Sequence, residues 1–315
     1  EIAQCLVGSE MCIRDRLYSM RYKNWLKKNA KSLEGKRVVL TGSTGGLGKE
    51  IALFLAYLKA DLVLADRNME KSNNLKALIL KKYPSAKITQ VVLDLESANS
   101  VKECVKMLES LESIDAIIHN AGVYSLPLED GEDYNTPFKV NFLHPYFITK
   151  SLLNKLRNSS LARVIVVGSL AYKFARFNIN DVDYNTSKSR NKIYGNSKRC
   201  LMLSLSELLK NEEKVKLSVV HPGVTPTNIT RHFPLILRGI IKLPMKCVFI
   251  SPKKASLSVI LGLFKDVKYH DWLGPKIFGV WGKPKESNLK NITEEECKEI
   301  FSLAEEKYKF LAGIE

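Results

Sequence analysis

Short runs of apolar residues alternate with longer amphipathic stretches over most of this chain. The short runs are bounded by turn residues and predict buried strands, whereas the stretches between them have the spacing of apolar positions that is typical of helices. The predicted strands are residues 36–41, 61–65, 88–93, 115–119, 163–167 and 216–220. The predicted helices are residues 50–58, 69–82, 97–111, 138–157 and 194–210.

The order of these elements predicts the architecture. Strands that alternate with helices and are apolar on both faces indicate a parallel sheet that is covered on both sides. The predicted fold class is therefore α/β, with a single doubly wound parallel sheet and helices on both faces. We expect residues 35–315 to form one domain, because no internal repeat or linker interrupts the pattern.

Two segments precede this domain. Residues 17–34 are basic with interspersed apolar residues such as Trp25, which predicts an amphipathic helix lying on the domain. Residues 7–16 resemble the translation of a sequencing adapter. We therefore expect residues 1–16 to be an adapter-derived or disordered tail, and the natural product to begin near Met20.

A glycine-rich turn, Thr41-Gly-Ser-Thr-Gly-Gly-Leu-Gly48, follows the first predicted strand and opens a helix. Glycines let backbone amides approach a pyrophosphate, and the N-terminus of a helix favours its negative charge. In this context we prefer a dinucleotide site to an ordinary glycine-rich turn. The expected contacts are Gly42, Ser43, Thr44, Gly46, Leu47 and Gly48.

Tyr194 and Lys198 lie four residues apart on a predicted helix and therefore on one of its faces. A phenol has a pKa near ~10, and a neighbouring ammonium favours the phenolate, so we expect Lys198 to lower the pKa of Tyr194. Tyr194 would then be an acid–base group near neutral pH. By itself the pair is weak evidence, because a tyrosine and a lysine at this spacing occur often by chance, and Tyr194 could be an ordinary surface aromatic.

Further motifs follow in an order that resembles the short-chain dehydrogenases/reductases. The matching segments are the glycine turn, residues 92–95, 119–122, 140–141 and 167–169, Tyr194 with Lys198, and residues 221–223 with Thr227. The resemblance covers about residues 35–285. It implies a Rossmann-like dinucleotide-binding and catalytic domain, and an NAD(P)-dependent oxidoreductase that interconverts an alcohol and a carbonyl by hydride transfer.

The resemblance also implies roles for individual residues. Tyr194 would be the general acid or base, while Lys198 would bind the nicotinamide ribose. Ser169 would donate a hydrogen bond to the reacting oxygen, and Asn141 would position a water behind Lys198. Beyond the glycine turn, the implied cofactor contacts are Asp66, Arg67, Asp94, Leu95, Asn120, Ala121, Gly122, Tyr194, Lys198, Pro222, Gly223 and Thr227.

The choice between NAD(H) and NADP(H) depends on residues after the second strand. Asp66 can accept hydrogen bonds from ribose hydroxyls and repel a 2′-phosphate, whereas Arg67 can pair with that phosphate. Gly45 adds no positive charge to the turn. The acid leads us to favour NAD.

Two long connections indicate where a substrate binds. Residues 173–192 separate Ser169 from Tyr194 by more than the family's usual spacing, as in its retinol-dehydrogenase-like branch, which suggests a bulky apolar substrate. Residues 233–250 predict an apolar lid with basic residues suited to weak contact with a membrane surface, and an ordinary surface loop is the alternative to that contact. His144 departs from the family pattern after Asn141, and we expect it to be structural.

Composition excludes several classes of function. The formal net charge is +16 over 315 residues, but the lysines are spread along the chain, so we expect a solvated surface and no nucleic-acid binding. The cysteines stand far apart (Cys5, Cys12, Cys104, Cys200, Cys247 and Cys297), which predicts no metal site or disulfide framework and fits the cytoplasm.

Two questions stay open at this point. A non-catalytic dinucleotide sensor or scaffold on the same fold is the alternative to an enzyme. The resemblance implies a homodimer or homotetramer that pairs through the helices carrying Asn141 and Tyr194, although the long insertion and the lid are placed where they could block it.

Overall fold

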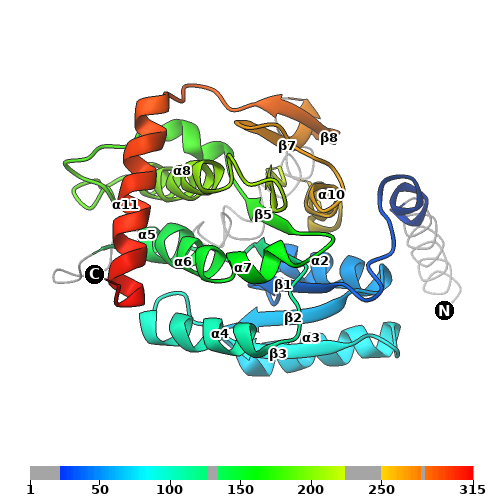
Figure 1. The fold of residues 1–315 in the computed structure, drawn as a ribbon. Coiled ribbons are helices and arrows are strands. Elements are labelled where there is room, and N and C mark those ends of the chain that lie inside the picture. Colours follow the sequence, from blue (N-terminus) through cyan, green and yellow to red (C-terminus); the bar gives the residue numbers. More distant parts are fainter. Residues whose placement is uncertain (1–21, 126–133, 224–249, 278–280, 315) are drawn as a thin grey trace, which may run out of the picture.

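The structure is a computed structural model that describes residues 22–125, 134–223, 250–277 and 281–314. Within these residues eight strands form one sheet in the order β3-β2-β1-β4-β5-β6-β7-β8 (Figure 1). All neighbouring strands are parallel except β7 and β8. Their bounds are β1 Arg37–Thr41, β2 Asp61–Asp66, β3 Ile88–Val92, β4 Ala116–His119, β5 Arg163–Val167, β6 Lys216–Val220, β7 Asp271–Ile277 and β8 Trp281–Asn288.

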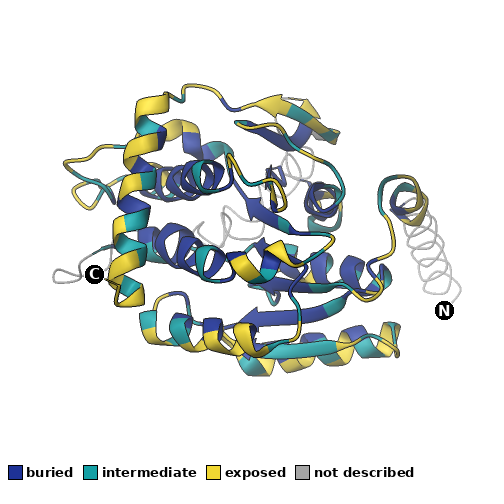
Figure 2. Cartoon of the chain, viewed as in Figure 1, coloured by how far each residue is buried: buried dark blue, intermediate teal, exposed yellow. Residues whose placement is uncertain are grey.

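Helices cover both faces of the sheet, which confirms the predicted doubly wound α/β class. The two faces bury separate apolar clusters, because successive strand residues point to opposite sides: Val39 belongs to one cluster, and Val38 and Leu40 belong to the other. Figure 2 shows the buried strands between these layers. One layer holds residues 22–29, α2 (Gly46–Tyr57), α3 (Met69–Lys82) and α10 (Pro252–Gly262). The other holds α4 (Ala98–Ser110), α5 (Thr136–Phe138), α6 (His144–Ser151), α7 (Leu153–Arg157), α8 (Arg190–Leu208) and α11 (Glu294–Ala312).

Local sequence fixes where several helices begin. In the described residues, side chains cap five α-helices. Asn68 accepts a hydrogen bond from Lys71 N at the start of α3, and the N-cap residues of α4, α5, α10 and α11 do the same: Ser97, Asn135, Ser251 and Thr293. At the other end of α11, Gly313 has φ 68°, a left-handed conformation that glycine adopts without strain.

The predicted helix over residues 138–157 is interrupted. A π-helical turn (η1, Lys139–Leu143) separates α5 from α6, and His144 N donates to Lys139 O across it. Pro145 has no N–H, so the carbonyl of Asn141, four residues earlier, cannot receive the usual α-helical hydrogen bond. Turns of this kind are frequent at functional sites.

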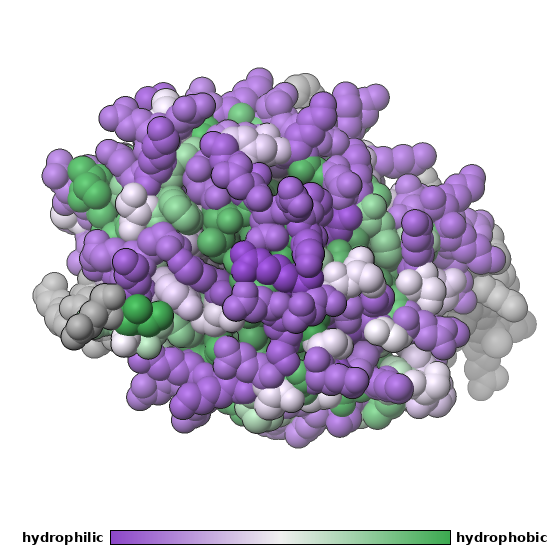
Figure 3. Space-filling model, in the orientation of Figure 1, coloured by the Kyte–Doolittle hydropathy of each residue, from purple (hydrophilic) through white to green (hydrophobic). Residues whose placement is uncertain are grey.

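Some predicted features lie outside the described residues: the tail at residues 1–16, Thr227, and the lid apart from Ile250. Of the predicted helix at 17–34, the described part is helical over residues 22–29. No helix in the described ranges is long and apolar enough to cross a bilayer. Hydrophilic side chains cover most of the face seen in Figure 3, with apolar ones in separate small groups.

Candidate active site

A cavity of about 710 Å³ runs along the carboxyl ends of the parallel strands. Ligands bind at this edge in open α/β sheets. Its walls come from the glycine turn, from the ends of β2 to β6 and from α8. It brings together Gly42, Thr44, Gly46, Leu47, Gly48, Asp66, Arg67, Asp94, Leu95, Asn120, Ala121, Gly122, Ser169, Tyr194, Lys198, Pro222 and Gly223. Ser43 is buried beneath the turn.

The glycine turn is packed too closely for any side chain at two of its positions. A Cβ on Gly42, whose φ is 65°, would lie 2.8 Å from the Ala121 Cα. A Cβ on Gly48 would lie 2.2 Å from the Gly42 carbonyl oxygen. Asn120 fixes the same turn, because its Nδ2 donates to Thr41 O at 3.1 Å and to Gly42 O at 2.9 Å. The exposed backbone and the adjoining α2 N-terminus therefore fit a dinucleotide pyrophosphate.

Asp66 has more partners than the sequence suggested. It is buried at the end of β2, where Oδ2 accepts hydrogen bonds from the hydroxyls of Ser43 (2.5 Å) and Ser72 (3.0 Å). Its Oδ1 accepts from Thr44 N at 3.2 Å. The carboxylate thus anchors the glycine turn as well as lining the cavity. Arg67, beside it, is exposed and forms an ion pair with Glu96 at 2.6 Å.

Asp94 and Leu95 follow β3 and line the same end of the cavity. His144 holds this segment from the other side, with its Nδ1 2.7 Å from Leu95 O. The ring is buried, and burial is the main reason that its pKa lies below the usual value. His144 therefore supports the segment that carries Asp94 and Leu95.

Tyr194 and Ser169 meet at the opposite end. Ser169 follows β5 and Tyr194 lies on α8, and both side chains line the cavity, where hydrogen bonding with Ser169 acts to lower the pKa of Tyr194. Gly195 makes this approach possible, because a Cβ there would lie 2.2 Å from Ala171 O in the turn after Ser169. Lys198 lies one helical turn further, with its ammonium donating to Val167 O at 3.2 Å.

The predicted effect of Lys198 on Tyr194 is wrong for this arrangement. The Lys198 Nζ lies 5.9 Å from the centre of the Tyr194 ring and bonds to a backbone carbonyl instead. Burial raises the pKa of Tyr194 to about 12, an effect that the Ser169 hydrogen bond opposes and Tyr124 reinforces. Burial also lowers the pKa of Lys198 to about 8. Desolvation, which the sequence does not show, dominates over the charge interaction.

Asn141 lies in the π-helical turn and is fully buried. Its side chain is fixed by Val123, accepting from Val123 N and donating to Val123 O, both at 2.9 Å. A Cβ on Gly122 would lie 2.9 Å from Asn141 Oδ1 and 3.1 Å from Lys198 Nζ. Asn141 and Lys198 therefore converge on the space that Gly122 leaves empty.

Sequence reasoning missed Tyr124 and Asn191, which line the cavity beside Tyr194. The Tyr124 ring packs edge-on against the Tyr194 ring at 5.4 Å, and its hydroxyl donates to Asn191 Oδ1 at 2.7 Å. Leu170 and Phe174 complete this wall. Tyr124 stands two residues after a recognised motif, but nothing in its local sequence indicates that it contacts Tyr194.

Another group of potential ligand atoms lies away from the cavity. Glu207, His270 and Cys297 place theirs within 4.8 Å of one another, and Cys297 Sγ is 3.5 Å from His270 Nε2. The Glu207 carboxylate already accepts a hydrogen bond from Tyr269 and lies 3.7 Å from the Lys210 ammonium. We assign these contacts to the packing of α8, β7 and α11.

Comparison with known families decides the identity of the chain. The family model described as short chain dehydrogenase matches residues 36–234. The chain belongs to the short-chain dehydrogenase family. Retinol dehydrogenase 14 of Mus musculus is 31% identical over 75% of this chain and 76% of its own length. Retinol dehydrogenase 13 of Homo sapiens is 34% identical over 64% of this chain and 62% of its own length. These relatives place the chain in the retinol-dehydrogenase-like branch of the family.

Solved structures agree on the fold. A short-chain dehydrogenase/reductase from Brucella melitensis superimposes with a TM-score of 0.56 at 24% identity, covering 73% of this chain and 90% of its own. An uncharacterised protein from Mycobacterium paratuberculosis gives a TM-score of 0.68 at 21% identity, covering 90% of this chain and 96% of its own. Because of its family, the present chain is an oxidoreductase that uses a nicotinamide dinucleotide as its cofactor.

Proposed function

We propose that this short-chain dehydrogenase interconverts a bulky apolar alcohol and its carbonyl by hydride transfer, with Tyr194 as the general acid or base. The observation that carries the proposal is the meeting of Ser169, Tyr194 and Lys198 in one cavity with the glycine turn. When bound, the dinucleotide supplies the hydride donor or acceptor. The protein supplies a proton at the substrate oxygen and holds that oxygen in place.

In the reductive direction, the Tyr194 hydroxyl donates its proton to the carbonyl oxygen, and the Ser169 hydroxyl donates a hydrogen bond to the same oxygen as charge develops there. A phenol with a pKa of about 12 is protonated at neutral pH, which suits it to this role. In the oxidative direction, Tyr194 must first lose its proton. The positive charge of an oxidised nicotinamide ring favours that loss.

Lys198 and Asn141 support this proton transfer. The Lys198 ammonium, held by Val167 O, is placed to bind ribose hydroxyls next to Tyr194. The main-chain carbonyl of Asn141 receives no hydrogen bond from Pro145, which has no N–H, and it can therefore accept one from a water molecule behind Lys198. We propose that the water bound to this carbonyl is part of the path by which protons reach Tyr194.

NAD is the cofactor that the charges at the end of β2 favour. Asp66 is fixed by three donors and is negative where a 2′-phosphate would approach. Arg67, the cation next to it, is compensated by Glu96 at 2.6 Å and Asp94 at 4.0 Å. A 2′-phosphate would therefore meet more negative than positive charge among these four side chains.

The substrate class follows from the wall beside Tyr194. Tyr124, Leu170 and Phe174 present aromatic and aliphatic surface to the cavity. Two of the relatives, at 31% and 34% identity, are named for retinol, a primary alcohol with a long apolar body, and we assign this chain a substrate of that class. We place the enzyme in the cytoplasm, where its described cysteines, Cys104, Cys200 and Cys297, would stay as the free thiols that they are.

A panel of apolar primary alcohols and their aldehydes tests the proposal, with turnover followed by the absorbance of the reduced nicotinamide. We expect turnover by the wild-type protein and a loss of at least ~100-fold in kcat for Tyr194→Phe, at unchanged dinucleotide affinity. Tight dinucleotide binding without turnover on any member of the panel would favour a sensor or scaffold instead.

A further inference from the structure

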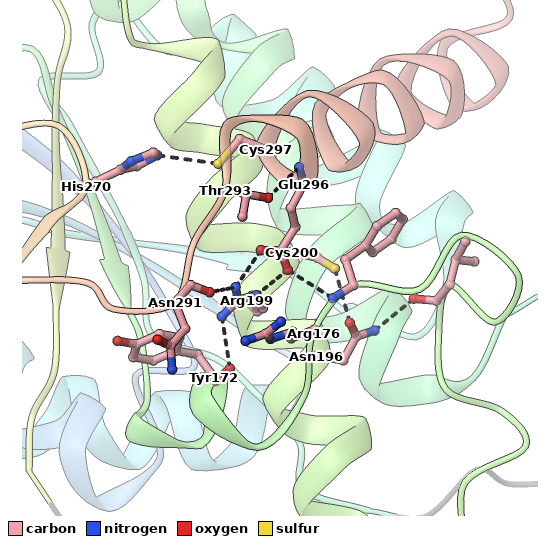
Figure 4. A network of polar contacts seen from close by, with 12 residues as sticks. Tyr172, Arg176, Asn196, Arg199, Cys200, His270, Asn291, Thr293, Glu296 and Cys297 are labelled. Atoms are coloured by element: carbon pink, nitrogen blue, oxygen red, sulfur yellow. Dashed lines mark hydrogen bonds and ion pairs between the residues drawn. The ribbon is translucent and has the colours of Figure 1, made fainter.

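A buried ion pair joins Arg199 of α8 to Glu296 of α11 (Figure 4). Arg199 follows Lys198, and its side chain is only 1% exposed. It binds Glu296 of α11 through two parallel hydrogen bonds, Nε to Oε1 and Nη2 to Oε2, each 2.5 Å long. A bidentate pair of this kind fixes orientation as well as distance.

The same two side chains also hold the backbone that follows Ser169. Arg199 Nη1 donates to the carbonyl oxygen of Tyr172 at 3.3 Å. Glu296 Oε1 accepts from the amide of Phe177 at 3.0 Å. The ion pair thus holds residues 170–177 by hydrogen bonds at two points, one near each end.

Residues 170–177 follow Ser169 directly and help to fix its position. Tyr172 N donates to Ser169 O at 3.1 Å, so the carbonyl held by Arg199 belongs to the same turn as the serine. That turn rests on α8 at Gly195, which faces Ala171. Gly195 and Arg199 are four residues apart and share one face of α8, whereas Tyr194 and Lys198 share the adjacent face, toward the cavity.

Arg199 also joins this turn to the chain before α11. Its Nη2 donates to the carbonyl oxygen of Asn291, and the guanidinium lies 5.8 Å from the centre of the Tyr172 ring. Glu296 is in the first turn of α11, where its N–H donates to the Thr293 cap at 3.2 Å. The ion pair therefore connects the serine turn, the tyrosine helix and the C-terminal helix.

We propose that Arg199 and Glu296 are positioning residues that keep Ser169 within hydrogen-bonding distance of Tyr194. By this contact the C-terminal helix α11 becomes part of the catalytic apparatus, although none of its residues lines the cavity. The inference rests on the proposed function of Ser169 and Tyr194. A buried pair that served only stability could be exchanged for apolar residues at little cost, whereas this one also binds two backbone groups of the serine turn.

The test compares Glu296→Ala with Glu305→Ala. Glu305 is the matched control, because it also anchors α11 through an ion pair, with Lys150 of α6, but it touches no part of residues 170–177. We expect both variants to unfold at lower temperature. Only Glu296→Ala should lower kcat, by about 10- to 100-fold, with substrate KM and NAD affinity within twofold of wild type. Glu296→Gln, which keeps an acceptor for the Phe177 amide, should lose less.

A second readout does not depend on turnover. With 3-fluorotyrosine at position 194, the ¹⁹F resonance reports the hydrogen bond from Ser169, and Ser169→Ala gives its position when that bond is broken. We expect Glu296→Ala to move the resonance toward the Ser169→Ala position, and Glu305→Ala to leave it in place. This comparison separates failure of the positioning role from failure of the proposed activity.

Two results would overturn the positioning role. One is a ¹⁹F resonance that Glu296→Ala leaves at the wild-type position. The other is an equal loss of kcat in the Glu296 and Glu305 variants, which would assign the effect to the docking of α11 in general. If Glu296→Ala does not fold, the double exchange Arg199→Met with Glu296→Leu refills the space without the two backbone contacts, and the same outcomes apply to it.

Discussion

A change at Gly122 perturbs the proposed catalytic geometry directly. The change Gly122→Ala adds one methyl group, whose carbon would lie 2.9 Å from Asn141 Oδ1 and 3.1 Å from Lys198 Nζ. Ordinary contacts of such a carbon begin near 3.4 Å. One or both side chains must therefore retreat by about 0.3–0.5 Å, a displacement comparable to the tolerance of a catalytic constellation.

The expected loss can be estimated from that displacement. A misplacement of about 1 Å can cost ~100-fold in rate, so a shift of half that size should lower kcat by about tenfold. This corresponds to about 1.4 kcal/mol in the activation barrier. The glycine turn at the other end of the cavity is untouched, and the affinity for ADP, which reports that end, should stay within twofold of wild type.

The assay is steady-state turnover of the best alcohol from the panel, with melting temperature and ADP titration measured on the same preparation. Asn141 is fixed by Val123 and by the Ser197 hydroxyl, at 3.0 Å, so we expect Lys198 to move more than Asn141. A folded Gly122→Ala protein with kcat within twofold of wild type would refute the idea that turnover requires the Lys198 ammonium to lie this close to Gly122.

Three further predictions have definite expected outcomes. Asp66→Asn removes one negative charge near the expected 2′-phosphate position and should improve NADP affinity relative to NAD by about tenfold when both are titrated. The control Ser72→Ala removes one hydrogen-bond donor to Asp66 but no charge, and it should leave the ratio of the two affinities unchanged. An unchanged ratio in Asp66→Asn would show that Asp66 does not determine cofactor choice. Lys198→Met should abolish turnover yet raise Tm by about 2–5 °C at pH 7. The folded-state pKa of Lys198 is about 8 and the usual value is 10.5, so the charged side chain lowers stability below pH 8, and this cost disappears as pH rises from 8 to 10.5. A Tm difference that is the same at pH 7 and pH 10 would contradict this origin. Light scattering should find a monomer, because α11 packs across α6 and α8, the helices through which pairing was expected. A dimer in which α11 is still protected from hydrogen exchange would contradict this prediction and would have to form through another surface.

Much of the fold could be predicted from the sequence, and the reason is physical. A parallel strand that is buried on both faces is a continuous apolar run, so β1, β2, β4 and β5 are visible without any tertiary information. Helix α3 has the bounds that were predicted for it, because Pro84 follows its end; the Asn68 cap at its start was found only in the structure. The cofactor turn and the Tyr194 helix are equally local, and their residues do line one cavity.

The remaining features depend on contacts between distant parts of the chain. Strand β7 contains Pro275, and β8 is a polar edge strand, so neither has the apolar pattern of the other strands. The pKa of Tyr194 depends on how much protein surrounds it, and the partners of Asp66 come from two other segments. The pairing of Arg199 with Glu296 spans 97 positions, and no spacing rule links them.

The most direct test of catalysis follows the hydride itself. Under single-turnover conditions, NADH carrying deuterium at the nicotinamide C4 is mixed with enzyme and an apolar aldehyde, and the product alcohol is analysed by mass spectrometry. We predict one deuterium per product molecule from one of the two C4 isotopic epimers, with a rate at least ~100-fold lower for Tyr194→Phe. Deuterium transfer at the wild-type rate in Tyr194→Phe, or none in the wild-type protein with any aldehyde of the panel, would contradict the role assigned to this site.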